Sequence, residues 1–305
     1  MKKVLVTDSL FIYPEHEALM LQAGIEIERL DTPNASEDEL IAAIQDKDGY
    51  ILGGIEKVTE PIISAAHNLK AISFTGTAWK GFIPSWKLAS QKGIKITNAP
   101  HANASAVAEW AFTTSLAMVR DTFELGRTGS GSFKTTPGFS DLTIGIIGMG
   151  SIGSRIAEMF QGVGVKNISY WNRSTIESSF NYQDISEILK NSDIVFVCVS
   201  SEAGDTFLDE EKLSQLKEGA IITCLTDSVV NEETLLSHLT SNHIRAFLDW
   251  TPKLPAYKEL SLHSFYCSSE STAFNTRSAN QLASDMVTQS MINILSGKDD
   301  DYIVL

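Results

Sequence analysis

The chain has 305 residues, of which 43% are hydrophobic and 20% are charged, which is the composition of an ordinary globular protein and a length that favours two domains. A formal net charge of −14 argues against a nucleic-acid partner, because such proteins need clustered lysine and arginine. No stretch approaches the roughly 20 apolar residues of a membrane span. The three cysteines have no metal-site spacing, so we expect buried thiols in a reducing compartment and no metal. Together with the lack of a long apolar stretch, this predicts no membrane partner and a cytoplasmic location.

Short β-branched runs alternate with helical patterns through the first hundred residues. The expected strands are KVLV, IEIERL, GYILGG, AISFTG and IKITNAP, with helices between them at 60–67 and 84–92. Ser36 and Glu39 have the spacing of a capping box and predict a further helix that starts after Ser36. Such alternation is typical of a parallel sheet covered by helices on both faces.

A second alternating series follows the longest helical pattern, at 103–126. The segment GRTGSGSFKTTPGFSD comes next and looks like a domain connector. The strands expected after it are TIGIIG, NISYWN, DIVFVCVS, GAIITCL, IRAFLDW and SFYCSS, with helices that start at Ser151, near 184, near 209 and at Asn231. A last helix, from about 276 to 296, is expected to return to the first domain. We therefore predict an α/β protein with two Rossmann-like, doubly wound parallel sheets, divided into residues 1–101 with 276–305 and residues 102–275.

The segment GMGSIG at 148–153 has the pattern G-x-G-x-x-G. It directly follows an expected strand and opens an expected helix, as a dinucleotide-binding turn requires. Gly148 permits the tight turn, Gly150 lets the backbone approach the pyrophosphate, and Gly153 allows close packing of helix on strand. We expect cofactor contacts from these glycines and from Ser151 and Ile152; the alternative is a glycine-rich turn without a ligand.

Asn172, Arg173 and Ser174 end the next expected strand. An NAD site normally has Asp or Glu there, which accepts a hydrogen bond from the ribose 2′-hydroxyl but would repel a 2′-phosphate. Asn172 removes that repulsion, and Arg173 can pair with the phosphate while Ser174 donates to it. The sequence therefore predicts NADP(H) as the preferred cofactor, with NAD(H) as the alternative in which Arg173 is a solvated loop charge.

Over nearly its whole length the chain resembles the D-2-hydroxyacid dehydrogenase family. The motifs are IKITNAPHANASAVAEW, TIGIIGMGSIGSRIA, the run from DIVFVCVS to LKEGAIITCLTDSVVNEETL, RAFLDWTPKLP and STAFNTRSA. The resemblance implies a small-molecule substrate, a substrate domain built from both chain ends, a central nucleotide domain, a cleft between them and often a homodimer. The ending Asn-Arg-Ser is similar to that of NADPH-using glyoxylate and hydroxypyruvate reductases in the family. We also expect cofactor contacts from Cys198, Val199, Thr226 and Asp249.

The chemistry of this family needs a cation that holds the 2-oxoacid, a His that protonates the developing alkoxide, and a Glu that orients the His. None of these stands where the family pattern places it. The alignment puts Thr226 at the Arg position, Leu254 at the Glu position, and Ser269 and Glu270 at the family's Pro-His pair. Three losses in three separate segments predict that the family's acid–base machinery is absent.

Lys80 follows the expected strand AISFTG, and ligands bind at the carboxyl ends of strands in open α/β sheets. It could supply the missing positive charge or act as an acid; the alternative is a surface lysine. Its loop corresponds to the family loop whose backbone amides hold the substrate carboxylate. The resemblance thus implies substrate contacts from Gly76, Thr77, Ala78 and Trp79.

His101 and Asn103 follow the strand IKITNAP. His101 is a candidate acid–base group at neutral pH, although a helix dipole would disfavour its charged form, and the alternative is ordinary loop packing. Asn103 matches a position where formate-dehydrogenase-like members bind substrate, and the alternative is a helix cap. His263 is a weaker candidate, because it begins the strand that Glu270 follows. Seven residues at about 3.3 Å each would separate it from Glu270 by roughly 20 Å.

Glu270 and Asp227 end strands on the expected cleft. A Glu270 buried beside the nicotinamide could hold and donate a proton, whereas an anionic Glu270 could bind an amine or imine; the alternative is a solvated acid at a helix entrance. We therefore favour an NADP(H)-dependent oxidoreductase with an altered site and a non-standard, imine or cationic, substrate. The two alternatives are a non-catalytic NAD(P)-binding sensor or scaffold, and a weak glyoxylate or hydroxypyruvate reductase that uses Lys80 and His101.

Overall fold

The computed structural model describes residues 1–7, 12–32, 34–129, 135–174, 176–200, 203–204, 207–241, 243–260 and 266–305. The chain divides into two compact units, Met1–Asn103 with Thr276–Leu305, and Ala104–Asn275. The chain therefore passes between the units after Asn103 and after Asn275. The glycine-rich segment was expected to connect two domains, but its described residues, 126–129 and 135–141, belong to the second unit. None of the helices in the described ranges is long and apolar enough to cross a membrane.

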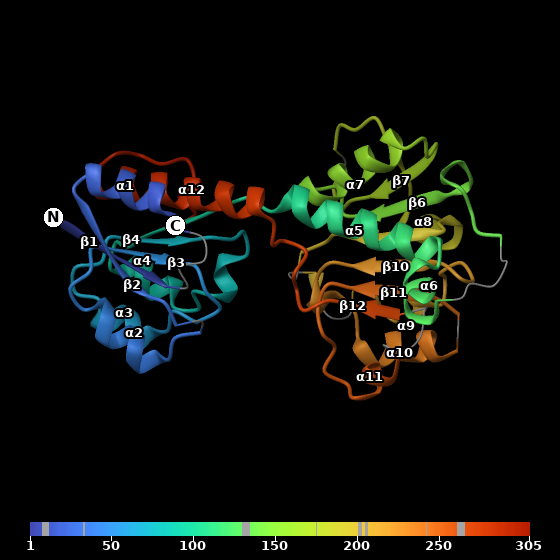
Figure 1. The fold of residues 1–305 in the computed structure, drawn as a ribbon, viewed down its shortest axis with the longest axis horizontal. Coiled ribbons are helices and arrows are strands. Elements are labelled where there is room, and N and C mark those ends of the chain that lie inside the picture. Colours follow the sequence, from blue (N-terminus) through green and yellow to red (C-terminus); the bar gives the residue numbers. More distant parts are fainter. Residues whose placement is uncertain are drawn as a thin grey trace. The chain divides into compact units, whose positions relative to one another are not determined.

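The first unit is built on a parallel sheet in the order β2-β1-β3-β4-β5. Helices α1 and α12 cover one face of this sheet, and α2, α3 and α4 pack on the other (Figure 1). The 3-10 helix η2 (Trp79–Gly81) follows β4. The strands are β1 (Lys2–Thr7), β2 (Ile25–Leu30), β3 (Gly49–Leu52), β4 (Ala71–Phe74) and β5 (Lys95–Asn98); the helices are α1 (Pro14–Gln22), α2 (Glu37–Ile44), α3 (Glu60–Ala65), α4 (Trp86–Gln91) and α12 (Arg277–Leu295).

Side-chain alternation in β1 explains why this sheet is covered on both faces. Val4 and Val6 pack in the core under α1 and α12, whereas Leu5 packs in the core under α2, α3 and α4, since successive side chains of a strand point to opposite faces. The expected capping box is also confirmed. Ser36 Oγ accepts from the Glu39 amide at 3.3 Å, and Glu39 Oε2 accepts from the Ser36 amide at 2.8 Å.

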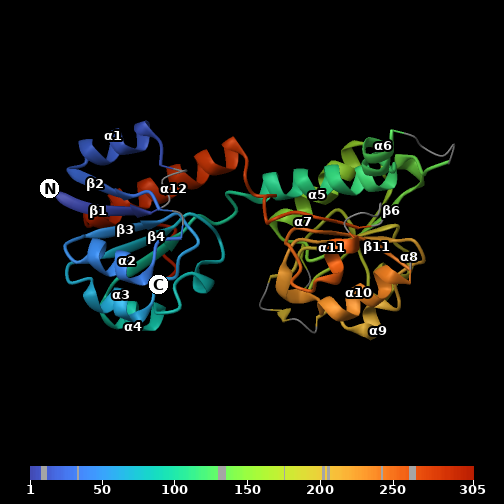
Figure 2. The same cartoon turned by 60° about the horizontal axis from the view of Figure 1, so that its bottom comes forward.

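The second unit has a parallel sheet in the order β12-β11-β10-β9-β6-β7-β8. Figure 2 shows α5 and α7 on one face, while α8, α9, α10 and α11 pack on the other. This confirms the predicted pair of doubly wound α/β sheets; the two-residue edge strand β8 was not predicted. The strands are β6 (Thr143–Ile147), β7 (Asn167–Trp171), β8 (Asn181–Tyr182), β9 (Ile194–Val197), β10 (Ile221–Cys224), β11 (Arg245–Leu248) and β12 (Tyr266–Ser268); the helices are α5 (Ala104–Val119), α6 (Thr122–Thr128), α7 (Ser151–Gly162), α8 (Ile185–Asn191), α9 (Glu210–Leu213), α10 (Glu232–Thr240) and α11 (Ala256–Leu260), with 3-10 helices η3 (Phe139–Asp141) and η5 (Asp227–Val229).

The long helical pattern at 103–126 forms two helices, so the expectation of one continuous helix was wrong. Asp121 adopts a left-handed conformation with φ 52° between α5 and α6, which a continuous α-helix cannot contain. Arg245 stabilises this break, because its Nη2 donates to the Met118 carbonyl at 2.6 Å and to Asp121 Oδ1 at 2.9 Å.

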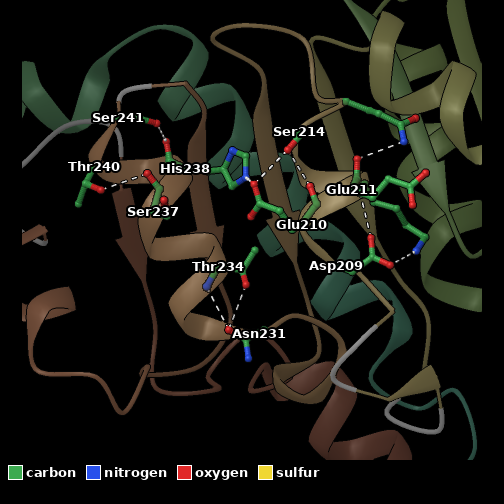
Figure 3. A network of polar contacts seen from close by, with 12 residues as sticks. Asp209, Glu210, Glu211, Ser214, Asn231, Thr234, Ser237, His238, Thr240 and Ser241 are labelled. Carbon is green, nitrogen blue, oxygen red and sulfur yellow. Dashed lines mark hydrogen bonds and ion pairs between the residues drawn. The ribbon is translucent and has the colours of Figure 1, made fainter.

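Helix α10 begins where the sequence predicts, after Asn231. The Asn231 side chain accepts from the Thr234 amide at 3.0 Å, which caps the helix (Figure 3). Helix α9 is tied to α10 by His238, whose Nε2 lies 3.2 Å from Glu210 Oε1, and Ser214 Oγ donates to the same oxygen at 3.1 Å. The Asn231 cap therefore fixes the start of α10, where a side chain of the candidate site lies, while the His238 contact fixes its last turn.

Candidate functional site

The turn between β6 and α7 requires glycine at two positions. Gly148 has φ +101°, and a Cβ there would lie 2.9 Å from the Cys198 backbone. At Gly153 an added Cβ would lie 2.2 Å from the Gly148 carbonyl oxygen. The Gly148 amide donates to the Trp171 carbonyl at 2.9 Å, which joins the turn to the end of β7. The two glycines therefore let the turn pass tightly between α7 and the neighbouring strands.

Gly150 lies in the same turn, but its surroundings are open, because a Cβ added there would meet no described heavy atom within 4 Å. The backbone amides of Met149, Gly150 and Ile152 donate to no other residue in the described part of the chain. These amides lie at the N-terminus of α7, where the helix dipole favours negative charge. The turn therefore offers donors and open space to an anion such as a pyrophosphate.

The end of β7 carries an exposed cation. Arg173 and Ser174 are exposed, and Asn172 Nδ2 donates to the Ser174 carbonyl at 3.2 Å. Arg173 makes no hydrogen bond or ion pair with the residues that the structure describes. A guanidinium in this position can pair with a phosphate group.

The other expected cofactor contacts lie after neighbouring strands of the same sheet. Cys198 and Val199 follow β9, Thr226 follows β10 and Asp249 follows β11. Thr226 Oγ1 donates to the Val199 carbonyl at 3.0 Å, which ties the two strand ends together. Burial raises the pKa of the Cys198 thiol to about 12, so this thiol is a poor nucleophile at neutral pH. Cofactor contact by these residues stays a prediction.

Asp249 holds the segment that contains Glu270. Its Oδ1 accepts from Ser269 Oγ at 2.5 Å and from the Ala273 amide at 3.3 Å, and its carbonyl accepts from Ser271 Oγ at 2.9 Å. Burial raises the pKa of Asp249. Glu270 lies within this fixed segment with its side chain exposed. Glu270 therefore lacks the burial that the proton-donor alternative requires, and its exposure fits both an acid that binds an amine or imine and a solvated acid at a helix entrance.

A pocket of about 530 Å³ opens beside Glu270 in the second unit. Its lining includes three carboxylates, Asp227, Glu232 and Glu270, together with Trp250 and Lys253; Ser228, Thr251 and Ser271 complete it. Nothing in the sequence indicates that Glu232 or Trp250 belongs here, because a first-turn acid and a buried tryptophan are ordinary structural residues. Within the described ranges, no three His, Cys, Asp or Glu side chains are placed to hold a metal ion.

In the first unit, the loop after β4 presents backbone amides. The amides of Gly76, Thr77 and Ala78 donate to no other described residue, whereas the Gly76 and Thr77 carbonyls accept from the Ala99 amide and from Asn98 Nδ2. The carbonyl contacts hold the loop, and the amides can donate to an acceptor such as a carboxylate. The expected contact Trp79 is buried, with 8% of its surface exposed.

The remaining candidates of the first unit lie next to this loop and after β5. Lys80 is exposed and lies over the Trp79 ring, with Nζ 5.8 Å from its centroid. His101 is exposed and has φ 63°. Asn103 makes no hydrogen bond with a described residue. The hydrogen bond from a first-turn amide of α5, which a helix-capping role requires, is therefore not found in the described part of the chain. His263 lies outside the described residues.

Comparison with known proteins gives consistent matches over the chain. The family profile of the D-isomer specific 2-hydroxyacid dehydrogenase NAD-binding domain matches residues 111–268. Human D-3-phosphoglycerate dehydrogenase is 27% identical over 312 residues, which cover 98% of this chain and 57% of that protein. Hydroxypyruvate reductase from Thermotoga maritima is 30% identical over 241 residues, 76% of this chain and 78% of that protein. The chain thus spans little more than half the length of the human relative.

A solved structure also shares the fold over the whole chain. It is an acyclic imino acid reductase in complex with NADPH and D-Arg, with a TM-score of 0.86, 22% identity and 100% coverage of both chains.

Proposed function

Because the chain belongs to the D-isomer specific 2-hydroxyacid dehydrogenase family, we propose that it is an NADP(H)-dependent oxidoreductase with an altered active site. We propose further that its substrate is an imine or a cationic compound instead of the usual 2-oxoacid. The observation that carries the cofactor preference is Arg173, an exposed cation at the end of β7 that pairs with no described residue, with no carboxylate at positions 172–174.

The residues after β6 and β7 fit a nicotinamide dinucleotide. The amides of Gly150 and Ile152 would hold the pyrophosphate, since they donate to no described residue and lie at a helix N-terminus. Arg173 and Ser174 would hold a 2′-phosphate. When bound, the reduced cofactor supplies the hydride for the reaction, so the remaining residues need only position the substrate and handle its proton and charge.

The positions of the family's catalytic residues hold side chains that cannot do the same work. Thr226 at the Arg position is uncharged, and its hydroxyl donates to the Val199 carbonyl. Leu254 at the Glu position packs against the hydrophobic core. Loss of a general acid alone costs about 10²–10⁴ in rate. We therefore expect reduction of a 2-oxoacid by the usual mechanism to be slow.

An imine substrate relieves the loss of the acid. A protonated imine already carries the positive charge that activates its carbon for hydride transfer, and the product amine needs no proton donated in that step. An anionic Glu270 would attract such a substrate, and its fixed backbone and exposed side chain suit this role. The likeness to the NADPH complex of an acyclic imino acid reductase supports this choice of substrate class.

A second candidate function rests on the loop after β4. The amides of Gly76, Thr77 and Ala78, which donate to no described residue, can hold a substrate carboxylate, and Lys80 supplies a positive charge beside them. These groups favour a weak reductase of 2-oxoacids such as glyoxylate or hydroxypyruvate, with His101 as the proton donor.

Two measurements on the purified protein test these functions. Fluorescence titration with NADPH and NADH should give tighter binding of NADPH, and equal affinity or a preference for NADH would refute the cofactor assignment. NADPH consumption is then followed with 2-oxoacids alone, with 2-oxoacids mixed with amines, and with aldehydes. We expect faster turnover when amine is present. Glyoxylate reduction that survives Glu270→Gln but not Lys80→Ala would favour the second candidate, and NADPH binding without any turnover would favour a non-catalytic role.

A further inference from the structure

We propose that the pocket in the second unit binds a positively charged nitrogen group of the substrate, an ammonium or a guanidinium. The inference rests on the proposed function and names the chemical group that the altered site recognises. The carboxylates come from three segments: Asp227 lies in η5 after β10, Glu232 lies in the first turn of α10, and Glu270 follows β12. Three segments that each bring a carboxylate to one pocket make a strongly negative surface there.

Two of these carboxylates lack partners among the described residues. The side chains of Asp227 and Glu270 make no hydrogen bond or ion pair within that part of the chain. Glu232 is held in place, because its Oε2 accepts from the Lys253 amide at 3.0 Å and from the Leu254 amide at 3.4 Å. Like charges in one pocket repel each other, and Lys253 is the one lysine among the described residues that line it. A ligand cation would relieve this repulsion and satisfy the carboxylate oxygens.

The wall of the pocket gives a second, independent sign of a ligand. Trp250 lines the pocket with only 6% of its surface exposed, and its Nε1 is buried without a hydrogen-bond partner in the described part of the chain. A buried donor without an acceptor is unfavourable by about 1–3 kcal/mol, and an acceptor oxygen of a ligand would relieve this cost after a shift of the indole ring, because Nε1 itself is buried. Indole rings also attract cations.

The pocket lies on the side of the sheet that the substrate should occupy. Its residues follow β10, β11 and β12, whereas Arg173 follows β7, on the other side of β6 in the strand order. In doubly wound sheets a dinucleotide lies across the point where the strand order reverses. With its 2′-phosphate at Arg173, the cofactor would therefore direct its reacting end toward β9–β12. A cation bound in the pocket is then on the reacting side.

The segment that carries Glu270 is fixed before a ligand arrives. Ser269 and Ser271, its two neighbours, both donate to Asp249. Ser271 has φ 58°, a left-handed conformation that these contacts hold in place. Binding a cation therefore requires ordering of the Glu270 and Asp227 side chains but not of the backbone that carries Glu270, which limits the entropic cost.

Calorimetric titration of the whole chain, with and without saturating NADPH, tests the inference. The probes are butylguanidinium and butylammonium, compared with the neutral counterparts butylurea and butanol respectively. We expect butylguanidinium to bind at least about tenfold more tightly than butylurea, as a charge-assisted contact predicts, and the preference to shrink as salt is raised. Glu270→Gln and Asp227→Asn should each remove most of this preference. Glu233→Gln, which removes the same charge from a position of α10 outside the pocket lining, should leave it intact.

Equal affinities for the charged and neutral probes would overturn the inference, as would a preference that survives both Glu270→Gln and Asp227→Asn. The dissociation constant of NADPH, measured in the same samples, separates this outcome from failure of the proposed function. NADPH that binds to a protein without cation preference refutes the cation site alone, whereas absence of NADPH binding refutes the cofactor assignment.

Discussion

The substitution Gly150→Ala separates binding of a cofactor from stability of the turn. Gly150 has φ −87°, which any residue adopts, and a Cβ there meets no described atom within 4 Å. Gly150 is also the N-cap of α7, where alanine is worse than glycine by up to about 1 kcal/mol. Reduced freedom of the unfolded chain offsets roughly 0.4–1 kcal/mol of this loss. We therefore expect the melting temperature to change little.

The effect of Gly150→Ala on NADPH should be large by contrast. The added methyl group occupies the open space beside the amides of the turn, where the pyrophosphate would approach. We expect the dissociation constant to rise at least about tenfold, equivalent to roughly 1.4 kcal/mol. Fluorescence titration measures the affinity, and differential scanning calorimetry measures the stability of the same sample.

Gly153→Ala provides the contrasting control. Its Cβ would lie 2.2 Å from the Gly148 backbone oxygen, and overpacking of this kind costs about 1–3 kcal/mol. At about 2–4 °C per kcal/mol for a unit of this size, the second unit should melt several degrees lower. Unchanged NADPH affinity in Gly150→Ala would refute the pyrophosphate assignment, and a similar loss of stability in the two variants would refute the packing argument.

Three further predictions concern other parts of the chain. Arg173→Ala should raise the dissociation constant of NADPH about tenfold and leave that of NADH nearly unchanged in the same titration; an equal loss for both cofactors would contradict the 2′-phosphate contact. Burial raises the pKa of the Asp249 carboxyl group in the folded state above its ordinary value of 3.8. The folded state therefore holds the carboxyl proton more tightly than the unfolded chain does, and the free energy of unfolding falls as pH rises above 3.8. Melting curves against pH should therefore show Asp249→Asn gaining stability over the wild type above 3.8 and not below; a constant difference would contradict this. Tyr50→Phe removes the hydroxyl that donates to Glu56 Oε1 at 3.0 Å. The buried carboxyl group of Glu56 then lacks this donor, which should lower the free energy of unfolding by about 1–3 kcal/mol. An unchanged thermal transition of the first unit would show that Glu56 finds another donor.

Most strands and the dinucleotide turn were predictable because their signals are local. The turn at 148–153 needs only its own glycines, the strand before it and the helix after it. The cap of α2 is similarly contained in Ser36 and Glu39. The same patterns also indicate the order in which strands and helices alternate, from which the two parallel sheets follow.

What the sequence could not predict depends on residues far apart in the chain. The break after α5 is stabilised by Arg245, which contacts Asp121 from 124 positions away. The pocket joins Asp227, Trp250 and Glu270 from three strand ends, and no spacing in the sequence signals that they share a wall. The exposure of Glu270 depends on how Asp249 holds its neighbours, which is again a tertiary contact.

The assembly of the first unit from both ends of the chain has a consequence for synthesis. Residues 1–103 leave the ribosome first, yet the face of their sheet that carries Val4, Val6 and Ile51 is covered by α12, at 277–295. The second unit is continuous in sequence, from Ala104 to Asn275, and can complete its core while α12 is still unmade. During translation, the sheet face of residues 1–103 therefore stays partly uncovered until α12 has been made, and an apolar face exposed in this way favours aggregation.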